Sequence, residues 1–180
     1  RVKSFEEIKE DVEEAKAYAR HINKVFLADG DALIIPQKRL LPIFELVKDA
    51  FPKLERIGIY GNVKSVLKKS VDELKALKEM GLGILYLGVE SGDQITLDRV
   101  CKGTTLDKTE EASKRVKEAG ITLSVTVLLG LGGVERSSIH AEETGKFLSR
   151  IDPEYIGALS IIVVPGTPLA RDLEQGTFQI

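Results

Sequence analysis

At 180 residues, the chain is long enough to form one domain with a substantial hydrophobic core. It is 43% hydrophobic and 30% charged, with a net charge of −2, so nothing favours non-specific binding to nucleic acid or to a membrane surface. No apolar run approaches the roughly 18 residues of a membrane-spanning helix, and no signal peptide is recognisable. The single cysteine, Cys101, excludes an intrachain disulfide and favours a reducing compartment, which predicts a cytoplasmic protein.

A capping box opens the first predicted helix, over residues 5–20. Ser4 is followed three residues later by Glu7, and apolar residues then recur at a spacing of three or four. The sequence reaches this helix with no Met and no preceding strand, and it ends at Ile180 without a stop signal. We therefore expect a domain whose first strand is missing and which is truncated at both ends.

Five short apolar segments alternate with helical patterns along the rest of the chain. The predicted strands cover residues 25–28, 56–60, 84–89, 121–129 and 156–164. The predicted helices lie within residues 36–51, 70–80, 107–119 and 137–149, and Gly81 and Gly120 end two of them. Strict alternation predicts a parallel sheet of the α/β class, and few polar residues in the central strands favour burial on both faces. Six strands would make a partial barrel and eight a full one.

All five predicted strands end in glycine with a polar or proline partner. In parallel α/β folds, ligands bind at these carboxyl ends of the strands. Ordinary turn chemistry explains any one such end, but five on one rim favour a functional rim. The segments at the strand ends are Asp29-Gly30-Asp31, Gly61-Asn62, Glu90-Ser91, the glycine-rich run 130–133 and the turn 165–168.

The residue types at these ends suit an amphoteric, nucleoside-like ligand. Two carboxylates beside the exposed backbone of Gly30 suit an ammonium group, and Glu90 with Ser91 suits sugar hydroxyls. The glycines at 130–133 would let a flat ring approach the backbone, and the proline–glycine turn could contact a base edge. A solvated turn or a helix cap is the alternative explanation at each place.

The chain offers no convincing nucleophile–base pair and no metal site. His21 and His140 are predicted to lie on helices, away from the strand ends, as surface or packing residues. Cys101 lies in a predicted loop between Arg99 and Lys102, where a reactive thiol and a structural one both fit. We therefore predict no catalytic residue and no metal ligand here, and we expect a cofactor to supply the chemistry.

Three segments resemble one branch of the radical S-adenosylmethionine (SAM) enzymes. Residues 88–93, followed by Leu97, Arg99 and Lys102, are similar to the fourth-strand segment of the branch that includes the tRNA methylthiotransferases, the elongator catalytic subunit and oxygen-independent coproporphyrinogen oxidase. Residues 127–133 resemble its fifth-strand glycine motif, and residues 164–169 its sixth-strand turn. Residues 1–180 thus resemble a radical SAM core domain, a partial (β/α)6 TIM-like barrel.

The resemblance implies a SAM site at the strand ends. Asp29, Gly30 and Asp31 stand where the family's Gly-Gly-Glu segment binds the SAM amino group, with Asp replacing the first Gly and the Glu. Glu90 and Ser91 would hold the ribose or the methionine moiety. The remaining implied contacts are Gly130 and the backbone of Val164, Pro165 and Gly166 beside adenine, Arg99 or Lys102 on the methionine carboxylate, and Asn62 on SAM or substrate.

The resemblance also implies a [4Fe-4S] cluster whose three-cysteine motif would lie upstream of Arg1. Cys101 cannot replace three thiolates, so this chain alone should lack cluster and radical chemistry. In the intact protein, electron transfer from a donor such as flavodoxin or ferredoxin would cleave SAM to methionine and a 5′-deoxyadenosyl radical. The substrate is not predicted.

Two alternatives remain open at this point. A (β/α)8-barrel isomerase or aldolase, cut in the middle, would need a Lys or Glu at a strand end, and Glu90 is the only plausible base. A non-catalytic barrel domain would keep the fold for binding only.

Overall fold

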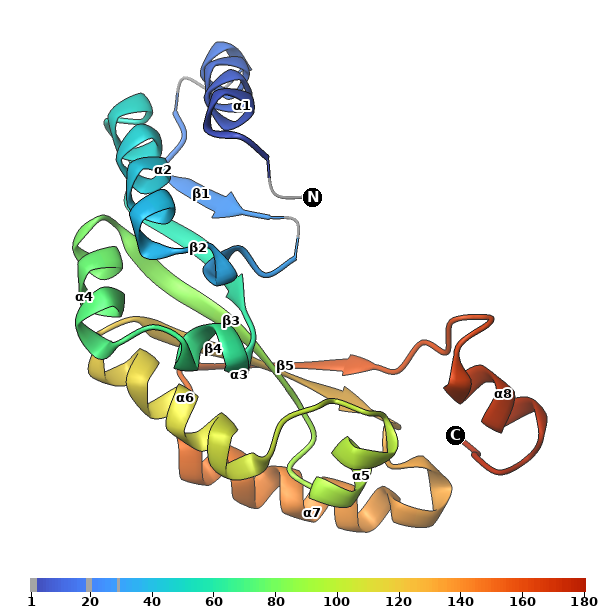
Figure 1. The fold of residues 1–180 in the computed structure, drawn as a ribbon. Coiled ribbons are helices and arrows are strands. Elements are labelled where there is room, and N and C mark those ends of the chain that lie inside the picture. Colours follow the sequence, from blue (N-terminus) through green and yellow to red (C-terminus); the bar gives the residue numbers. More distant parts are fainter. Residues whose placement is uncertain (1–2, 19–20, 29) are drawn as a thin grey trace. The chain divides into compact units, whose positions relative to one another are not determined.

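The computed structural model describes residues 3–18, 21–28 and 30–180 (Figure 1). The strands are β1 (Lys24–Leu27), β2 (Arg56–Gly61), β3 (Leu82–Glu90), β4 (Thr122–Leu129) and β5 (Tyr155–Ser160). The helices are α1 (Phe5–Tyr18), the 3-10 helix η1 (Ala32–Ile34), α2 (Gln37–Ala50), α3 (Val63–Leu67), α4 (Val71–Glu79), α5 (Gln94–Arg99), α6 (Leu106–Glu118), α7 (Gly133–Ile151) and α8 (Pro168–Glu174).

The five strands form one sheet in chain order, β1-β2-β3-β4-β5. The pairs β1–β2 and β4–β5 are parallel, so the predicted α/β class with a parallel sheet is confirmed. The strands do not close on themselves, as in a partial barrel. By its contacts, the chain divides into two units, Arg1–Tyr86 with Arg115–Leu123, and Leu87–Lys114 with Ser124–Ile180.

The first unit buries one face of its strands beneath helices. Ile57, Ile59 and Leu85 are fully buried, whereas Phe26 and Tyr60 remain 40% and 50% exposed. Alternate side chains of a strand point to opposite faces, so the exposed residues mark the other face of the sheet. The prediction that the central strands are covered on both faces therefore fails at Tyr60 of β2, whereas it holds at Leu123, Ser124 and Val125 of β4, which are all buried.

Local signals in the sequence set several helix ends as predicted. Capping boxes form at Ser4–Glu7 and at Ser70–Glu73, where each serine accepts a hydrogen bond from the glutamate N–H. Gly81 and Gly120 follow α4 and α6 with φ of +108° and +72°, the left-handed stop expected of glycine.

The second unit has its core between β3, β4 and α7. Val89, Val125 and Phe147 are buried there, whereas every residue of β5 is exposed. β5 ends at Ser160, four residues before the predicted end, and α7 begins at Gly133 rather than near residue 137. Short helices α3, α5 and α8 were not predicted. Among the described residues, no helix is long and apolar enough to cross a membrane.

Candidate functional site

Glu90, the last residue of β3, has an unusual backbone. Its φ is +63°, a region that non-glycine residues seldom occupy, and the Ser91 N–H donates to the Val89 carbonyl at 2.8 Å. This hydrogen bond closes a tight γ-turn centred on Glu90, which is a strained conformation. Strained residues of this kind concentrate at functional sites.

The Glu90 carboxylate is paired with Lys102. Lys102 Nζ donates to Glu90 Oε1 at 2.8 Å, and the two side chains are 27% and 19% exposed. The pair lies over Gly88, because a Cβ built there would be within 3.1 Å of Lys102 Nζ and closer still to Glu90 Oε1. Glycine at position 88 therefore makes room for the ion pair on the strand surface.

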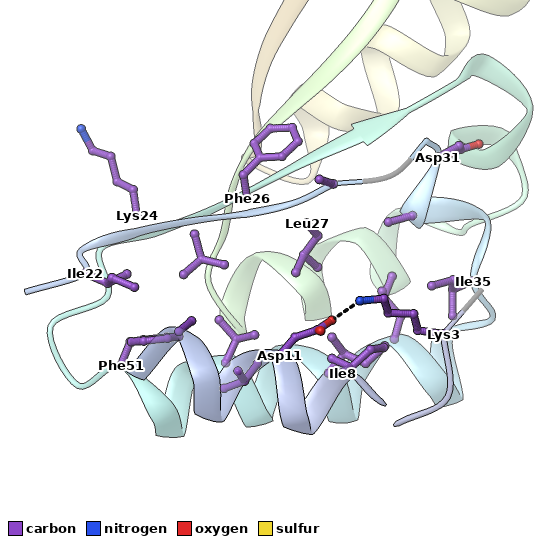
Figure 2. Close-up of a pocket in the computed structure, with 18 of the residues that line it drawn as sticks. Lys3, Ile8, Asp11, Ile22, Lys24, Phe26, Leu27, Asp31, Ile35 and Phe51 are labelled. Atoms are coloured by element: carbon purple, nitrogen blue, oxygen red, sulfur yellow. Dashed lines mark hydrogen bonds and ion pairs between the residues drawn. The ribbon is translucent and has the colours of Figure 1, made fainter. Parts of the chain in front are cut away.

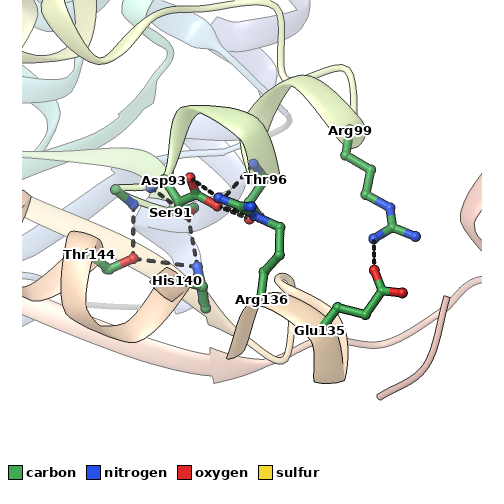
Figure 3. A network of polar contacts seen from close by, with 9 residues as sticks. Ser91, Asp93, Thr96, Arg99, Glu135, Arg136, His140 and Thr144 are labelled. Atoms are coloured by element: carbon green, nitrogen blue, oxygen red, sulfur yellow. Dashed lines mark hydrogen bonds and ion pairs between the residues drawn. The ribbon is translucent and has the colours of Figure 1, made fainter. Parts of the chain in front are cut away.

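A buried network fixes the turn that follows Glu90 (Figure 3). Ser91 is fully buried, and its oxygen lies 2.8 Å from His140 Nδ1. The Gly92 N–H donates to Thr144 Oγ1 at 2.9 Å, and the Asp93 N–H donates to Ser91 Oγ at 2.9 Å. The Ser91 hydroxyl is thus occupied within the protein, and it shapes the turn.

Asp93 anchors the same turn through Arg136. Arg136 donates from Nε to Asp93 Oδ2 at 2.8 Å and from Nη2 to Oδ1 at 2.9 Å, a two-point contact. Asp93 Oδ2 also accepts from the Thr96 hydroxyl and N–H, which caps α5. The Arg136 hydrogen bond lowers the pKa of Asp93 to about 2, with Thr96 contributing in the same direction.

In the first unit, Asp31 presents another carboxylate after the end of β1. The Ser65 hydroxyl donates to Asp31 Oδ1 at 2.9 Å, while Asp31 Oδ2 is buried and has no partner among the described residues. Burial raises the pKa of Asp31, because the charged form has lost water. Asn62 caps α3 by accepting the Ser65 N–H at 2.9 Å, and Asp29 lies outside the described residues.

A cavity of about 910 Å³ lies between α1, β1 and α2 in the first unit. Figure 2 shows Asp31 toward the Ile35 end of the cavity, with Phe51 at the other end. Its walls are mostly apolar, and Asn62 also lines it. The buried carboxylate of Asp31 is therefore beside space that can admit a ligand.

Three aromatic rings also gather on the open face of the sheet in this unit. Phe26, Tyr60 and Tyr86 come from β1, β2 and β3, and their ring centroids lie 4.7 to 5.8 Å apart in edge-to-face pairs. The Phe26 ring packs against Gly58, where a Cβ would lie 2.8 Å from Cδ2. This cluster was not predicted from the sequence.

Arg99 is held by the end of the chain. Its Nη2 donates to the Thr177 carbonyl at 2.6 Å, its guanidinium lies 5.1 Å from the Phe178 ring centroid, and Glu135 is 3.7 Å away. None of these partners is a predicted site residue, so the structure does not bring Arg99 together with Glu90. Lys102 is the cation that the structure places beside Glu90.

The two backbone segments predicted to flank adenine are turns. Gly130 has φ of +85° and follows β4 directly. Pro165 and Gly166 form the centre of a turn in which the Thr167 N–H donates to the Val164 carbonyl at 3.3 Å, with φ of +80° at Gly166. This proline–glycine pattern is typical of a type II turn, so the predicted rigid turn is confirmed.

His140 was predicted to lie away from the strand ends, and this is wrong. It is buried as a packing residue, as expected, but it contacts Ser91 directly after β3 and the Leu128 carbonyl near the end of β4. The polar stripe Arg136, His140 and Thr144, spaced by four along one helix, is the sequence signal that could have revealed this contact. His21, by contrast, is exposed beyond the end of α1.

Residues that could hold a metal ion do not gather in the described parts of the chain. They contain no group of three histidine, cysteine or acidic side chains with suitable geometry. Cys101, the one cysteine in the sequence, is exposed and free. These 180 residues therefore do not fit a [4Fe-4S] cluster by themselves.

The sequence matches the family described as the radical SAM superfamily over residues 1–143. This chain belongs to the radical SAM superfamily. The predicted family is therefore confirmed, and members of this superfamily use SAM and a [4Fe-4S] cluster.

Relatives of this radical SAM chain include porphyrin-related enzymes. It is 28% identical over 147 residues to the anaerobic magnesium-protoporphyrin IX monomethyl ester cyclase of Cereibacter sphaeroides, covering 82% of this chain and 24% of the cyclase. The fold matches coproporphyrinogen III oxidase (HemN) from Escherichia coli with a TM-score of 0.73 at 13% identity, over 96% of this chain and 43% of HemN.

The fold also matches Elp3 of Methanocaldococcus infernus, with a TM-score of 0.71 at 16% identity, over 97% of this chain and 45% of Elp3. These two likenesses show that the chain shares the fold of the coproporphyrinogen oxidase and of Elp3. The chain spans less than half the length of each of these three proteins. The comparisons give no support to an isomerase, an aldolase or a non-catalytic barrel.

Proposed function

We propose that this radical SAM chain forms the SAM-binding core of an enzyme that cleaves SAM reductively and uses the resulting radical on a substrate. The observation that carries the proposal is the family match over residues 1–143. When SAM and the cluster are bound, they supply the radical chemistry, and the protein supplies binding and orientation. The cluster thiolates and the substrate are not assigned to residues of this chain.

The first unit fits the amino group of SAM. Asp31 Oδ2 is a buried acceptor that has no partner within the described part of the chain, and such an atom gains most from an ammonium donor. We place the SAM amino group on Asp31 and the adjacent backbone of Gly30, with Asn62 as a further contact. Asp29 stays a predicted contact on the basis of the sequence alone.

The second unit fits the ribose and the methionine carboxylate. Glu90 offers acceptors to two sugar hydroxyls, and Lys102 offers an ammonium to a carboxylate. Their ion pair holds both groups in place before the ligand arrives. Ser91 contributes through the turn it shapes, and Arg99, which the Thr177 carbonyl holds, is not assigned to the carboxylate.

The adenine ring is assigned to backbone at the ends of β4 and β5. Gly130, and the turn formed by Val164, Pro165 and Gly166, are the two backbone segments that we assign to the base edge. Gly166 has open space where a Cβ would be, so a ring can approach its backbone.

The reaction also needs a one-electron donor. We propose a flavodoxin or a ferredoxin for this role, in the cytoplasm, where a reducing environment keeps Cys101 and cluster thiolates reduced. The macromolecular or small-molecule substrate is left unassigned.

The test is anaerobic reconstitution of the full-length protein with iron and sulfide, followed by reduction in the presence of SAM. We expect 5′-deoxyadenosine by mass spectrometry. Glu90→Gln should weaken SAM binding by about tenfold, because it removes the charge that faces Lys102. Glu79→Gln, the same change at an exposed position on α4, is the matched control. A reconstituted protein that binds no SAM, or that yields no 5′-deoxyadenosine, would refute the proposal.

A further inference from the structure

We propose that His140 is a positioning residue for the SAM site. Its imidazole ties the turn after β3 to the carboxyl end of β4, and so holds Glu90 in its SAM-binding orientation. The inference rests on the proposed function, because it takes Glu90 and Gly130 as residues that contact SAM.

The two ring nitrogens of His140 join two separate strand ends. Nε2 lies 3.1 Å from the Leu128 carbonyl, and Nδ1 lies 2.8 Å from Ser91 Oγ. A carbonyl oxygen only accepts, so in the neutral ring Nε2 carries the proton and Nδ1 accepts from the Ser91 hydroxyl. The ring is buried, so neither bond is exchanged for water.

The strained backbone of Glu90 needs such support. A non-glycine residue at φ of +63° persists only where the surrounding contacts enforce it. Three side chains of α7, one turn apart, each bond to a different residue of the turn, so that Arg136 holds Asp93, His140 holds Ser91 and Thr144 holds the Gly92 N–H. The stripe therefore fixes the three residues that directly follow Glu90.

His140 differs from the other two members of the stripe because it also reaches β4. Leu128 is the second-last residue of that strand, two residues before Gly130. The His140 Cβ is seated against Gly132, where an added Cβ would lie 2.8 Å away. One side chain thus sets the spacing between the strand end that carries Glu90 and the one that carries Gly130.

Two substitutions by an amide side chain each remove one of the two hydrogen bonds of His140. In His140→Gln the longer side chain can still donate to the Leu128 carbonyl but has no acceptor at the Nδ1 position. In His140→Asn the shorter side chain can still accept from Ser91 but does not reach Leu128. His140→Leu removes both bonds, and His21→Leu makes the same change at the exposed histidine as the control.

SAM affinity is measured by titration calorimetry on the reconstituted full-length protein. Thermal unfolding and amide hydrogen exchange are measured on the same samples. We expect each His140 variant to bind SAM about tenfold more weakly at a temperature where it is fully folded, as for other residues that orient a contacting group. Exchange should accelerate in the peptides covering residues 88–95 and 128–133, and the His21 control should change neither quantity.

The outcomes separate this inference from the proposed function. If the unaltered protein binds no SAM, the proposed function fails, and hydrogen exchange still tests whether His140 holds the two strand ends. If a folded variant binds SAM with unchanged affinity, or if exchange at the two segments is unchanged, the inference is overturned. Global unfolding of all three variants would overturn it too, because His140 would then be a residue of the core.

Discussion

Asp93 and Asp31 carry pKa shifts of opposite sign. Asp93 is ionised in a two-point contact with Arg136, which lowers its pKa to about 2 from 3.8. Burial has removed water from Asp31, and this effect outweighs its hydrogen bond to Ser65, so the pKa of Asp31 is raised. The first carboxylate therefore stabilises the fold, whereas the second is poised for a ligand.

For Asp93, we predict that Asp93→Asn lowers the free energy of unfolding at neutral pH by roughly 1–2 kcal/mol, allowing for solvent screening. The pKa of Asp93 in the folded protein lies below its value in the unfolded chain. This stabilisation is therefore complete above pH 3.8 and is lost as the pH falls through about 2. Urea unfolding of both proteins across this range measures it. Lys53→Gln, which removes an exposed cation after α2, should leave the profile unaltered, and an unchanged pH dependence in Asp93→Asn would contradict the assignment.

For Asp31, we predict that Asp31→Asn raises the thermal stability of the ligand-free protein at neutral pH and weakens SAM binding by about tenfold. The folded pKa lies above the unfolded 3.8, so ionised Asp31 costs stability once the pH exceeds the folded pKa. The gain in stability of Asp31→Asn should vanish below pH 3.8. Parallel melting curves and SAM titrations check both effects, and a destabilised variant would show that Asp31 is a structural group.

Two glycines of the α7 region, one that caps the helix and one within it, have opposite expected responses to alanine. A Cβ at Gly132, the residue that caps the helix, would lie 2.8 Å from the His140 Cβ, whereas at Gly145 nothing lies within 4 Å. We predict that Gly132→Ala destabilises the protein by about 1–3 kcal/mol through overpacking, and that Gly145→Ala stabilises it by about 0.5–1 kcal/mol. Urea unfolding measures both. Equal changes in the free energy of unfolding for the two variants would mean that the His140 side chain can move away from an added Cβ.

Among the elements, those with local signals could be predicted and those set by distant contacts could not. The capping boxes and glycine stops of α1, α4 and α6 act within a few residues, so sequence alone placed them. α7 begins earlier than its glycines suggest, because the Val134 N–H is satisfied by the Gln179 carbonyl and Phe178 packs on Gly133. β5 ends at Ser160 because its partner β4 ends opposite it at Leu129.

The candidate site divides in the same way. Glu90 and Asp31 could be singled out by residue type and position, since carboxyl ends of strands carry ligands, and Lys102 by the family resemblance. The Glu90–Lys102 pairing and the bonds of His140 join groups 12 to 49 residues apart. The polar stripe of α7 is a local signal that His140 makes such a contact, but it does not identify the partner. Arg99 shows the converse, because the Thr177 carbonyl and the Phe178 ring hold it instead.

Over the whole molecule, large apolar side chains stay exposed on several strands. They include Phe26, Tyr60, Leu129, Ile156 and Leu159, and Ile162 is exposed just after β5. We predict that this 180-residue chain binds a hydrophobic dye such as ANS and self-associates with rising concentration, because exposed edge strands are templates for pairing. Leu159→Lys should reduce both, as judged by dye fluorescence and sedimentation, and a monomer without dye binding would contradict the prediction.

The aromatic cluster gives the chain an optical property. The sequence has no tryptophan and four tyrosines, so ultraviolet emission comes from tyrosine alone. Tyr60 and Tyr86 have ring centroids 5.8 Å apart, close enough for excitation energy to pass between them. A molecule that binds to this face would alter the tyrosine emission and its polarisation. The unlabelled protein can therefore report on binding to the open face of its first unit.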